Sequence, residues 1–263
     1  MDKDILVAII EDDLFSRNWM SLLLVRDWRT RVMGEVTSRY ELATFLENTN
    51  SRIDILLTDV DIFGGDYSYN DICQTIKNHD HEMKILCTGV RAEERIFKQL
   101  DNEMCCGYIL KQEIGYSLGW ALSFASDGNW LLTPGTLEAA HRMNYRLPNN
   151  KMILSGQKSI PGFTERESEV ARLAFIFSLG RRDLADELKI SEQWSYGLVS
   201  ELYEKLGLGD ILSGEVDPAA YLGDNTIIQQ HFREIMAQLG TSKKAKDLET
   251  LAFHFMTMPD ILN

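Results

Sequence analysis

The first half of the chain alternates between two patterns of apolar residues. Five short runs rich in apolar residues are typical of strands, and the second of them is a weaker signal than the others. These runs lie at residues 4–10, 31–36, 53–60, 83–88 and 107–110. Apolar residues at helical spacing follow each run, in segments 14–25, 38–49, 71–79, 92–100 and 114–126. In the first of these segments they are Phe15, Trp19, Leu22 and Leu23. Strands that alternate with helices predict an α/β doubly wound fold, with a five-stranded parallel sheet covered on both faces.

The second half has helical spacing without strand-like runs. Residues 127–160 are interrupted by turn residues, so we predict a linker there, with a short helix at 136–143. Thr164 and Glu167 have the spacing of a capping box at the start of a helix. A short helix at 182–188, a tight turn and a third helix at 192–206 give a helix-turn-helix layout. The apolar residues of the third helix are Trp194, Leu198, Leu202 and Leu206.

Residues 210–263 are expected to form a helical extension. Its first part, 210–224, is rich in turn residues, and helices are predicted at 226–239 and 246–256. The apolar stripe on the first of these helices is typical of packing against the same domain or against a second copy of the chain. The predicted parts are therefore 1–126, 127–160, 161–209 and 210–263, the last serving dimerisation or docking.

The composition is ordinary for a soluble globular protein and argues against several classes. No apolar run reaches the roughly 18 residues of a membrane span, and the acidic N-terminus is unlike a signal peptide. Four cysteines fit neither a metal site nor a disulfide framework. We therefore expect a cytoplasmic protein with reduced thiols. The net charge of −13 argues against general coating of nucleic acid, but not against a local DNA-reading surface.

Polar side chains stand at the ends of four predicted strands. Glu11 and Asp12 end the first strand, Asp59 the third and Thr88 the fourth, and Lys111 follows the fifth. In an open α/β sheet these ends face one crevice. Clustered carboxylates repel one another and need a cation, and oxygen ligands suit Mg²⁺. Because Lys111 and Thr88 could hold a phosphoryl group, the pattern predicts phosphoryl transfer to an aspartate.

These strand-end residues belong to a longer set of features. The set comprises the acid pair Glu11-Asp12, Asp59, Thr88 followed by Gly89, and Tyr108 three residues before Lys111. Residues 4–126 thereby resemble the receiver domain of two-component response regulators, which implies a flavodoxin-like fold. Two positions depart from that family, where Phe63 replaces a usual proline and Gln112 follows the lysine. A pseudo-receiver that uses the acids only for structure is the alternative.

The resemblance also implies roles for individual residues. Asp59 would accept the phosphoryl group from a sensor histidine kinase. Mg²⁺ would be held by Asp12, Asp59 and the backbone carbonyl of Asp61, with Glu11 assisting. Thr88 and Lys111 would contact the phosphoryl group, and Tyr108 would be the switch aromatic. The face of the fourth helix, fifth strand and fifth helix commonly pairs receivers, so a homodimer is expected.

Residues 163–208 carry a second resemblance. Segments 163–170, 184–185, 190–192 and 202–208 match the LuxR-type helix-turn-helix output domain of response regulators, and 130–134 resembles its connector. This implies DNA binding through the third helix. The expected contacts come from basic residues and from polar side chains facing the groove. They are Arg181, Arg182, Lys189, Ser191, Gln193, Tyr196, Ser200 and Lys205.

The third helix departs from that family where DNA contact is expected. Residues 194–198 lack the usual basic residue and histidine. Residues 161–209 carry six basic and nine acidic side chains, which gives a net charge of −3. Phosphate contacts supply most non-specific DNA affinity, so a helix-turn-helix kept as a scaffold for protein binding is the alternative.

We therefore expect a Mg²⁺-dependent response regulator that binds DNA and is not an enzyme. The alternative is a signalling adaptor whose second half binds protein.

Overall fold

The computed structural model describes residues 4–49, 51–64, 68–79, 82–100, 103–156, 160, 162–217, 222, 225–239 and 245–262. The chain divides into two compact units. The first comprises Met1–Lys158 with Met258–Asn263, and the second comprises Ser159–Thr257. No helix in the described ranges is long and apolar enough to cross a membrane.

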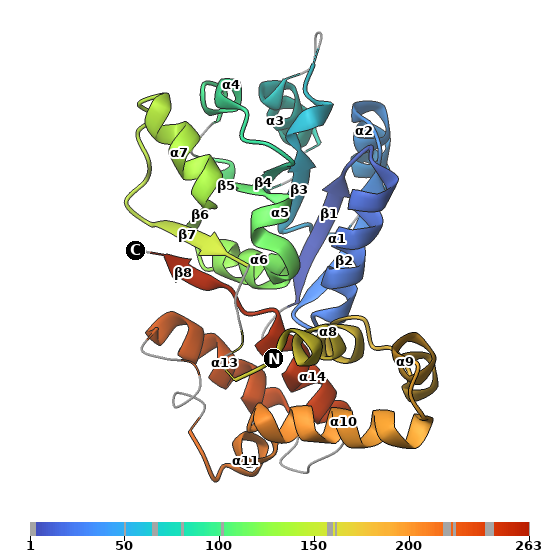
Figure 1. Cartoon of the computed structure of the whole chain (residues 1–263). Coiled ribbons are helices and arrows are strands. Elements are labelled where there is room, and N and C mark those ends of the chain that lie inside the picture. The colour runs from blue at the N-terminus through green and yellow to red at the C-terminus, as the bar shows by residue number, and fades with distance from the viewer. Residues whose placement is uncertain are drawn as a thin grey trace. The chain divides into compact units, whose positions relative to one another are not determined.

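The first unit contains the predicted parallel strands. They are β1 (Ile5–Ile10), β2 (Thr30–Val36), β3 (Ile55–Asp59), β4 (Lys84–Gly89) and β5 (Cys105–Leu110). They are ordered β2-β1-β3-β4-β5 and all pair in parallel, so the predicted doubly wound arrangement of this part is confirmed (Figure 1). The apolar runs form strands because both faces of the sheet are covered.

The prediction of five strands is wrong, because the sheet has eight. The added strands are β6 (Trp130–Leu132), β7 (Lys151–Ser155) and β8 (Asp260–Leu262). Two of them lie in the expected linker, and the third lies in the expected helical extension. Strands of three to five residues leave too short a pattern to distinguish them from loops. Residues 157–159 and 161, at the end of that linker, lie outside the described residues.

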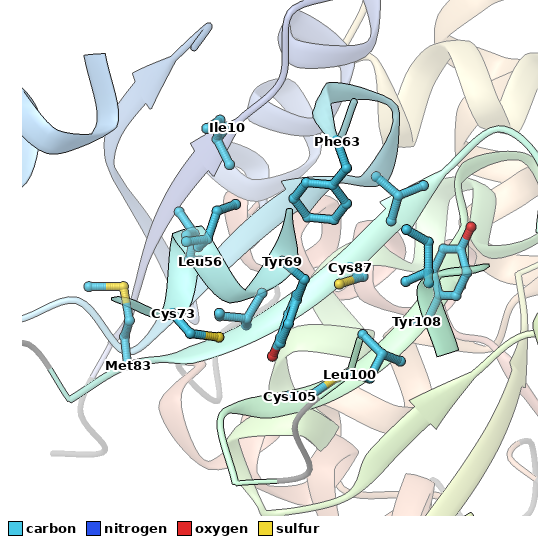
Figure 2. Close-up of a cluster of buried hydrophobic side chains, with 14 of the residues drawn as sticks. Ile10, Leu56, Phe63, Tyr69, Cys73, Met83, Cys87, Leu100, Cys105 and Tyr108 are labelled. Atoms are coloured by element: carbon cyan, nitrogen blue, oxygen red, sulfur yellow. The ribbon is translucent and has the colours of Figure 1, made fainter. Parts of the chain in front are cut away.

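Helices cover the two faces of the sheet. One face packs against α1 (Leu14–Arg26) and α6 (Leu118–Ser126). A large apolar cluster on the other face takes buried residues from four helices (Figure 2). These are α2 (Arg39–Asn48), α3 (Tyr69–Asn78), α4 (Glu94–Phe97) and α7 (Pro134–Arg142). The helix predicted at 92–100 is therefore reduced to a single turn. That predicted at 114–126 is reduced to α6, preceded by α5 (Lys111–Ile114) and η2 (Gly115–Ser117).

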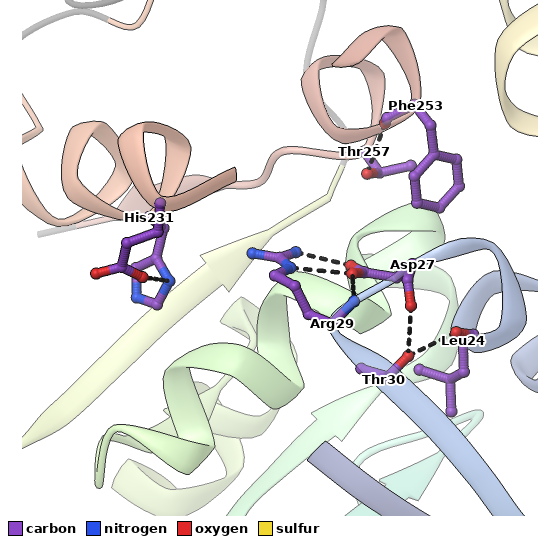
Figure 3. A network of polar contacts seen from close by, with 8 residues as sticks. Leu24, Asp27, Arg29, Thr30, His231, Phe253 and Thr257 are labelled. Atoms are coloured by element: carbon purple, nitrogen blue, oxygen red, sulfur yellow. Dashed lines mark hydrogen bonds and ion pairs between the residues drawn. The ribbon is translucent and has the colours of Figure 1, made fainter. Parts of the chain in front are cut away.

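A buried carboxylate ties α1 to the sheet and to α6. Asp27 accepts two hydrogen bonds from the Arg29 guanidinium, at 3.0 and 2.7 Å (Figure 3). The Thr30 hydroxyl lies 2.5 Å from the Leu24 carbonyl oxygen, and the guanidinium of Arg29 stacks on Trp120. A methyl group at Gly119 would collide with Asp27, so this approach of α6 requires glycine.

The second unit is helical in its described residues. It contains α8 (Glu165–Ala171), the π-helical turn η3 (Arg172–Ile176), α9 (Arg181–Leu188), α10 (Glu192–Lys205), α11 (Leu208–Ser213), α13 (Thr226–Gln238) and α14 (Ala245–Met256). Thr164 and Glu167 form the expected capping box of α8. Part of the turn-rich stretch 210–224, namely 218–221 and 223–224, lies outside the described residues.

The apolar face assigned to the third helix needs correction. Trp194 is 63% exposed, whereas Ser195 is buried and directed inward with Val199 and Leu202. The Ser195 hydroxyl donates to the carbonyls of Arg181 and Glu192, at 2.9 and 2.7 Å. A small polar residue with its hydrogen bonds satisfied is therefore buried where hydrophobicity alone favoured the indole.

Replacing Leu131 tests the extension of the sheet by β6, β7 and β8, which we name the sheet extension. Leu131 is fully buried in β6 and pairs with Gly107 of β5. We expect Leu131→Ala to reduce the free energy of unfolding by about 3 kcal/mol, because it leaves a cavity in a packed sheet. Val25→Ala, at a 68% exposed position, is the control and should cost less than about 0.5 kcal/mol. Equal effects of the two substitutions in denaturant unfolding would contradict the strand.

Candidate functional site

The ends of neighbouring parallel strands bring three acidic residues together. Glu11 and Asp12 follow β1, and Asp59 ends the adjacent β3. Each offers a carboxylate oxygen, and these atoms all lie within 4.8 Å of one another. Glu11 and Asp59 are buried, whereas Asp12 is exposed. We name Glu11, Asp12 and Asp59 the acidic rim.

Lys111 joins two members of the acidic rim. It is the first residue of α5, directly after β5. Its ammonium nitrogen lies 2.6 Å from Glu11 Oε2 and 2.8 Å from Asp59 Oδ2. A lysine that is distant in sequence from both carboxylates thus meets them at one edge of the sheet, as the strand-end positions predicted.

Burial governs the electrostatics of this group. It raises the pKa of Glu11 to about 7, with a further increase from Asp59 and an opposing effect of Lys111. Burial alone would lower the pKa of Lys111, but the hydrogen bonds that its ammonium donates to Asp59 and Glu11 raise this pKa above its ordinary value. Burial and the charge of Asp59 also raise the pKa of Asp61. One ammonium thus faces several carboxylates, a donor set that suits a hard divalent cation.

Asp59 also shapes the loop that follows it. Its Oδ1 accepts a hydrogen bond of 3.1 Å from the Asp61 amide and caps the 3₁₀ turn η1 (Val60–Ile62). The side chain of Asp61 is exposed. Phe63, at the position of the family's proline, is buried and packs edge-on against Tyr69. Phe63 is thus fixed in the core directly after the turn that Asp59 caps.

Thr88 stands beside Asp59 in the sheet. The two residues are partners in the β3–β4 register. Within the described part of the chain, the buried Thr88 hydroxyl has no hydrogen-bond partner. A methyl group at the following Gly89 would lie 2.9 Å from Val60 and 3.1 Å from the Tyr108 hydroxyl. A small residue is therefore favoured at Gly89, directly after the buried Thr88.

Tyr108 is fully buried in β5. Its hydroxyl donates to the Arg91 carbonyl at 2.8 Å and accepts from the Glu93 amide at 3.0 Å. The ring packs against Phe97, 5.7 Å away between centroids. The side chain of Tyr108 therefore lies in the core and is hydrogen-bonded to the loop after β4.

An apolar cavity of about 510 Å³ opens beside the rim. Its apolar walls come from α1 and from the segment after β5, and Thr88 and Lys111 also line it. Phe15 on α1 is 82% exposed, and of the apolar residues at helical spacing in this helix only Leu23 is fully buried. The apolar pattern did not predict this cavity. Phe15, three residues after Asp12, lines it and was the available signal.

The basic residues expected to contact DNA lie on and after α9. Arg182 is exposed in its first turn. Arg181 is half-buried, with its guanidinium 5.8 Å from the centre of the Tyr196 ring. Lys189 ends the helix in the left-handed conformation, with φ of 55°, and is exposed. The structure thus brings Arg181 close to one expected contact on α10.

The remaining expected contacts lie on or immediately before α10. Gln193, Tyr196 and Ser200 are exposed. Ser191 caps the helix, and its hydroxyl accepts from the Trp194 amide at 3.2 Å. Lys205 forms an ion pair with Glu167, which lowers the pKa of Glu167 to about 2. Lys205 therefore already pairs with a carboxylate, whereas the sequence suggested a lysine free to contact DNA phosphate.

Comparison with known proteins gives structural likeness only. No family model and no curated protein matches the chain. The RcsB response regulator of Salmonella typhimurium is 22% identical, with 78% of this chain and 92% of that chain covered and a TM-score of 0.43. The response regulator ChrA of a heme-sensing two-component system is 22% identical, with coverage of 78% and 90% and a TM-score of 0.41.

The isolated receiver (REC) domain of RcsB from Salmonella enterica serovar Typhimurium, solved with the phosphomimetic BeF₃⁻, is 20% identical. It covers 52% of this chain and 99% of that chain, with a TM-score of 0.45. The chain is thus similar to two-component response regulators.

Removing the Lys111 ammonium tests the geometry of the acidic rim. Lys111→Met leaves two buried carboxylates without their shared cation, so we expect a loss of about 3 kcal/mol in unfolding free energy without metal. Mg²⁺ should then stabilise the variant more than the parent, because it replaces the missing charge. Lys77→Met, at an exposed lysine, is the control. Thermal unfolding with and without Mg²⁺ measures both effects, and identical Mg²⁺ responses of parent and Lys111→Met would contradict them.

Proposed function

We propose that the chain is a two-component response regulator whose first unit accepts a phosphoryl group on Asp59 from a sensor histidine kinase. The observation that carries this proposal is the Lys111 ammonium, 2.6 Å from Glu11 and 2.8 Å from Asp59 beside Asp12. An ion pair needed only for stability requires no third carboxylate and no unpartnered hydroxyl nearby. Asp12 and Thr88 supply both.

The acidic rim fits Mg²⁺. Asp12, Asp59 and the backbone carbonyl of Asp61 would hold the ion, with Glu11 assisting. Bound there, Mg²⁺ would neutralise charge on the transferring phosphoryl oxygens. The raised pKa of Glu11 supports this assignment, because burial disfavours the charge of this carboxylate and a neighbouring cation would offset that cost.

The residues of the chain have distinct tasks in the transfer. A carboxylate oxygen of Asp59 attacks phosphorus, the new oxygen–phosphorus bond forms, and the bond from phosphorus to the kinase histidine breaks. Lys111 exchanges its contact with Asp59 Oδ2 for a phosphoryl oxygen, and the Thr88 hydroxyl donates to another. Phosphorylation adds roughly −1.5 to −2 charges at this edge. Tyr108, which is bonded to the loop after β4, then transmits the change in that loop.

The second unit is proposed to bind DNA through α10, as a transcription regulator that is dimeric when active and acts in the cytoplasm. Arg182 and Lys189 are exposed, and Gln193 and Ser200 stand on the accessible face of α10. The second candidate is a signalling adaptor. Trp194 and Tyr196 are 63% and 56% exposed on the same helix, and exposed aromatic residues are typical of protein-binding surfaces.

Phosphorylation of Asp59 is the first test of this proposal. Incubation with acetyl phosphate and Mg²⁺ should add one phosphoryl group to the parent, because a carboxylate nucleophile lies beside the cation and an ammonium. Asp59→Asn should add none, and Asp61→Ala, which keeps the backbone carbonyl, should still be labelled. Intact-mass spectrometry gives the result. A parent that stays unmodified while another receiver is labelled in the same tube would contradict the proposal.

DNA binding separates the two candidates for the second unit. In a gel shift with genomic fragments, Arg182→Ala should weaken binding across all sequences and lower the slope of log affinity against log salt by about one. Lys205→Ala is the matched control with a smaller effect, because Glu167 already neutralises this lysine. Absence of any shift at low salt would favour the adaptor.

A further inference from the structure

The single helical turn α5, which begins with Lys111, is held by residues 130–156, which contain β6, α7 and β7. The Glu113 carboxylate accepts two contacts from the Gly135 amide, at 3.2 and 3.0 Å. Gly135 is the second residue of α7. A carboxylate at the N-terminus of a helix is favoured by the helix dipole. A Cβ atom at Gly135 would lie 2.8 Å from a methyl group of Leu110 and 3.0 Å from the Glu113 carboxylate, so a larger residue would displace these side chains.

The opposite end of α5 is fixed to β7. The amide of Gly156, directly after β7, donates to the Glu113 carbonyl at 2.8 Å. A methyl group at Gly156 would lie 1.8 Å from the Ile114 carbonyl oxygen, so only glycine allows the two backbones to approach this closely. The buried Thr133 hydroxyl also accepts from the Leu110 amide at 3.1 Å. Leu110 before Lys111 and Glu113 after it thus both contact residues of the 130–156 segment.

The 130–156 segment also covers α4 and β5, which belong to the face through which two receivers were expected to pair. The helix α7 packs against β5 and α4. Arg142 of α7 forms an ion pair of 2.6 Å with Glu94 of α4. Tyr145, just after α7, packs on Phe97 at 5.2 Å between centroids, and β6 pairs with the edge of β5. The chain's own α7 and β6 therefore occupy much of this face, so the dimer proposed above would form through another surface.

We propose that Glu113 is a positioning residue, which couples Lys111 to the strands β6, β7 and β8. The inference rests on the proposed function, because it requires Lys111 to change partner when Asp59 is phosphorylated. Lys111 and Glu113 belong to one four-residue turn, so a movement of this turn when Lys111 changes partner would displace the contact of the Glu113 carboxylate with Gly135 and that of the Glu113 carbonyl with Gly156. The sheet extension, in place of a second receiver, takes up the change.

The strand before Gly156, β7, connects α5 to the last strand of the sheet. β7 pairs antiparallel with β8, from Ser155 with Asp260 to Ile153 with Leu262. β8 follows the last residues of the second unit directly in the sequence. A change at Gly156 thus reaches a strand covalently connected to the second unit. By reciprocity of coupling, loosening this strand also changes the phosphorylation site.

Hydrogen exchange measured on the full chain tests the inference. Peptides covering 151–156 and 258–262 are followed with Mg²⁺, before and after phosphorylation by acetyl phosphate. We expect phosphorylation of the parent to alter exchange in both peptides. Glu113→Ala should abolish this response and lower the second-order rate of phosphorylation about tenfold, as for other residues that position a ligand through a second group. Glu113→Gln keeps an oxygen acceptor for the Gly135 amide and should restore both.

The outcomes separate the inference from the proposed function. Phosphorylation of the parent without altered exchange in 151–156 would overturn the inference and leave the proposed function standing. A parent that is never labelled would overturn both. A merely structural role for Glu113 would lower stability but leave the exchange response intact. Since the parent measurement needs no variant, a poorly folding Glu113→Ala does not remove the test.

Discussion

The ion pairs of Lys111 with Glu11 and Asp59 are the interaction on which the site depends. They join the residue after β5 to the ends of β1 and β3, across the intervening β4. A buried group of carboxylates is unstable without positive charge nearby, because burial removes the water that would otherwise stabilise each ion. The lysine supplies one charge, and the surplus of carboxylates leaves the rim suited to another cation. The chemistry thus follows from the order of strands in the sheet.

The sheet extension changes how such a rim can communicate. In a sheet that ended at β5, the outer edge of β5 and the turn that begins with Lys111 would be open to another molecule. Here Thr133, Gly135 and Gly156 contact the backbone or carboxylate around that lysine. Two of these three residues are glycines at which a Cβ atom would meet its neighbour at 3.0 Å or less. The close approach is therefore a specific packing arrangement, built from residues that an apolar pattern cannot mark.

Predictability from sequence followed the length of each pattern. Four of the main strands could be predicted because each is an apolar run buried along nearly its whole length, and the rim followed from their parallel order. β2 gave a weaker pattern because only its two ends are fully buried. The strands β6 and β8 have three residues each, and β8 pairs with β7, which lies about 100 residues earlier in the sequence. Such pairing between distant segments leaves no local signal. Ser195 shows the same limit, because its hydrogen bonds rather than its hydrophobicity bury it.

A crystal structure of the first unit in the full chain, grown with Mg²⁺ and trifluoroberyllate, is the most direct measurement of the central claim. We expect the fluoride adduct on Asp59, the metal between Asp12 and Asp59, and both the Lys111 ammonium and the Thr88 hydroxyl directed to the fluorine atoms. The account would be contradicted if Lys111 kept both of its carboxylate contacts in those crystals while Asp59 carried no adduct and the acidic rim no metal.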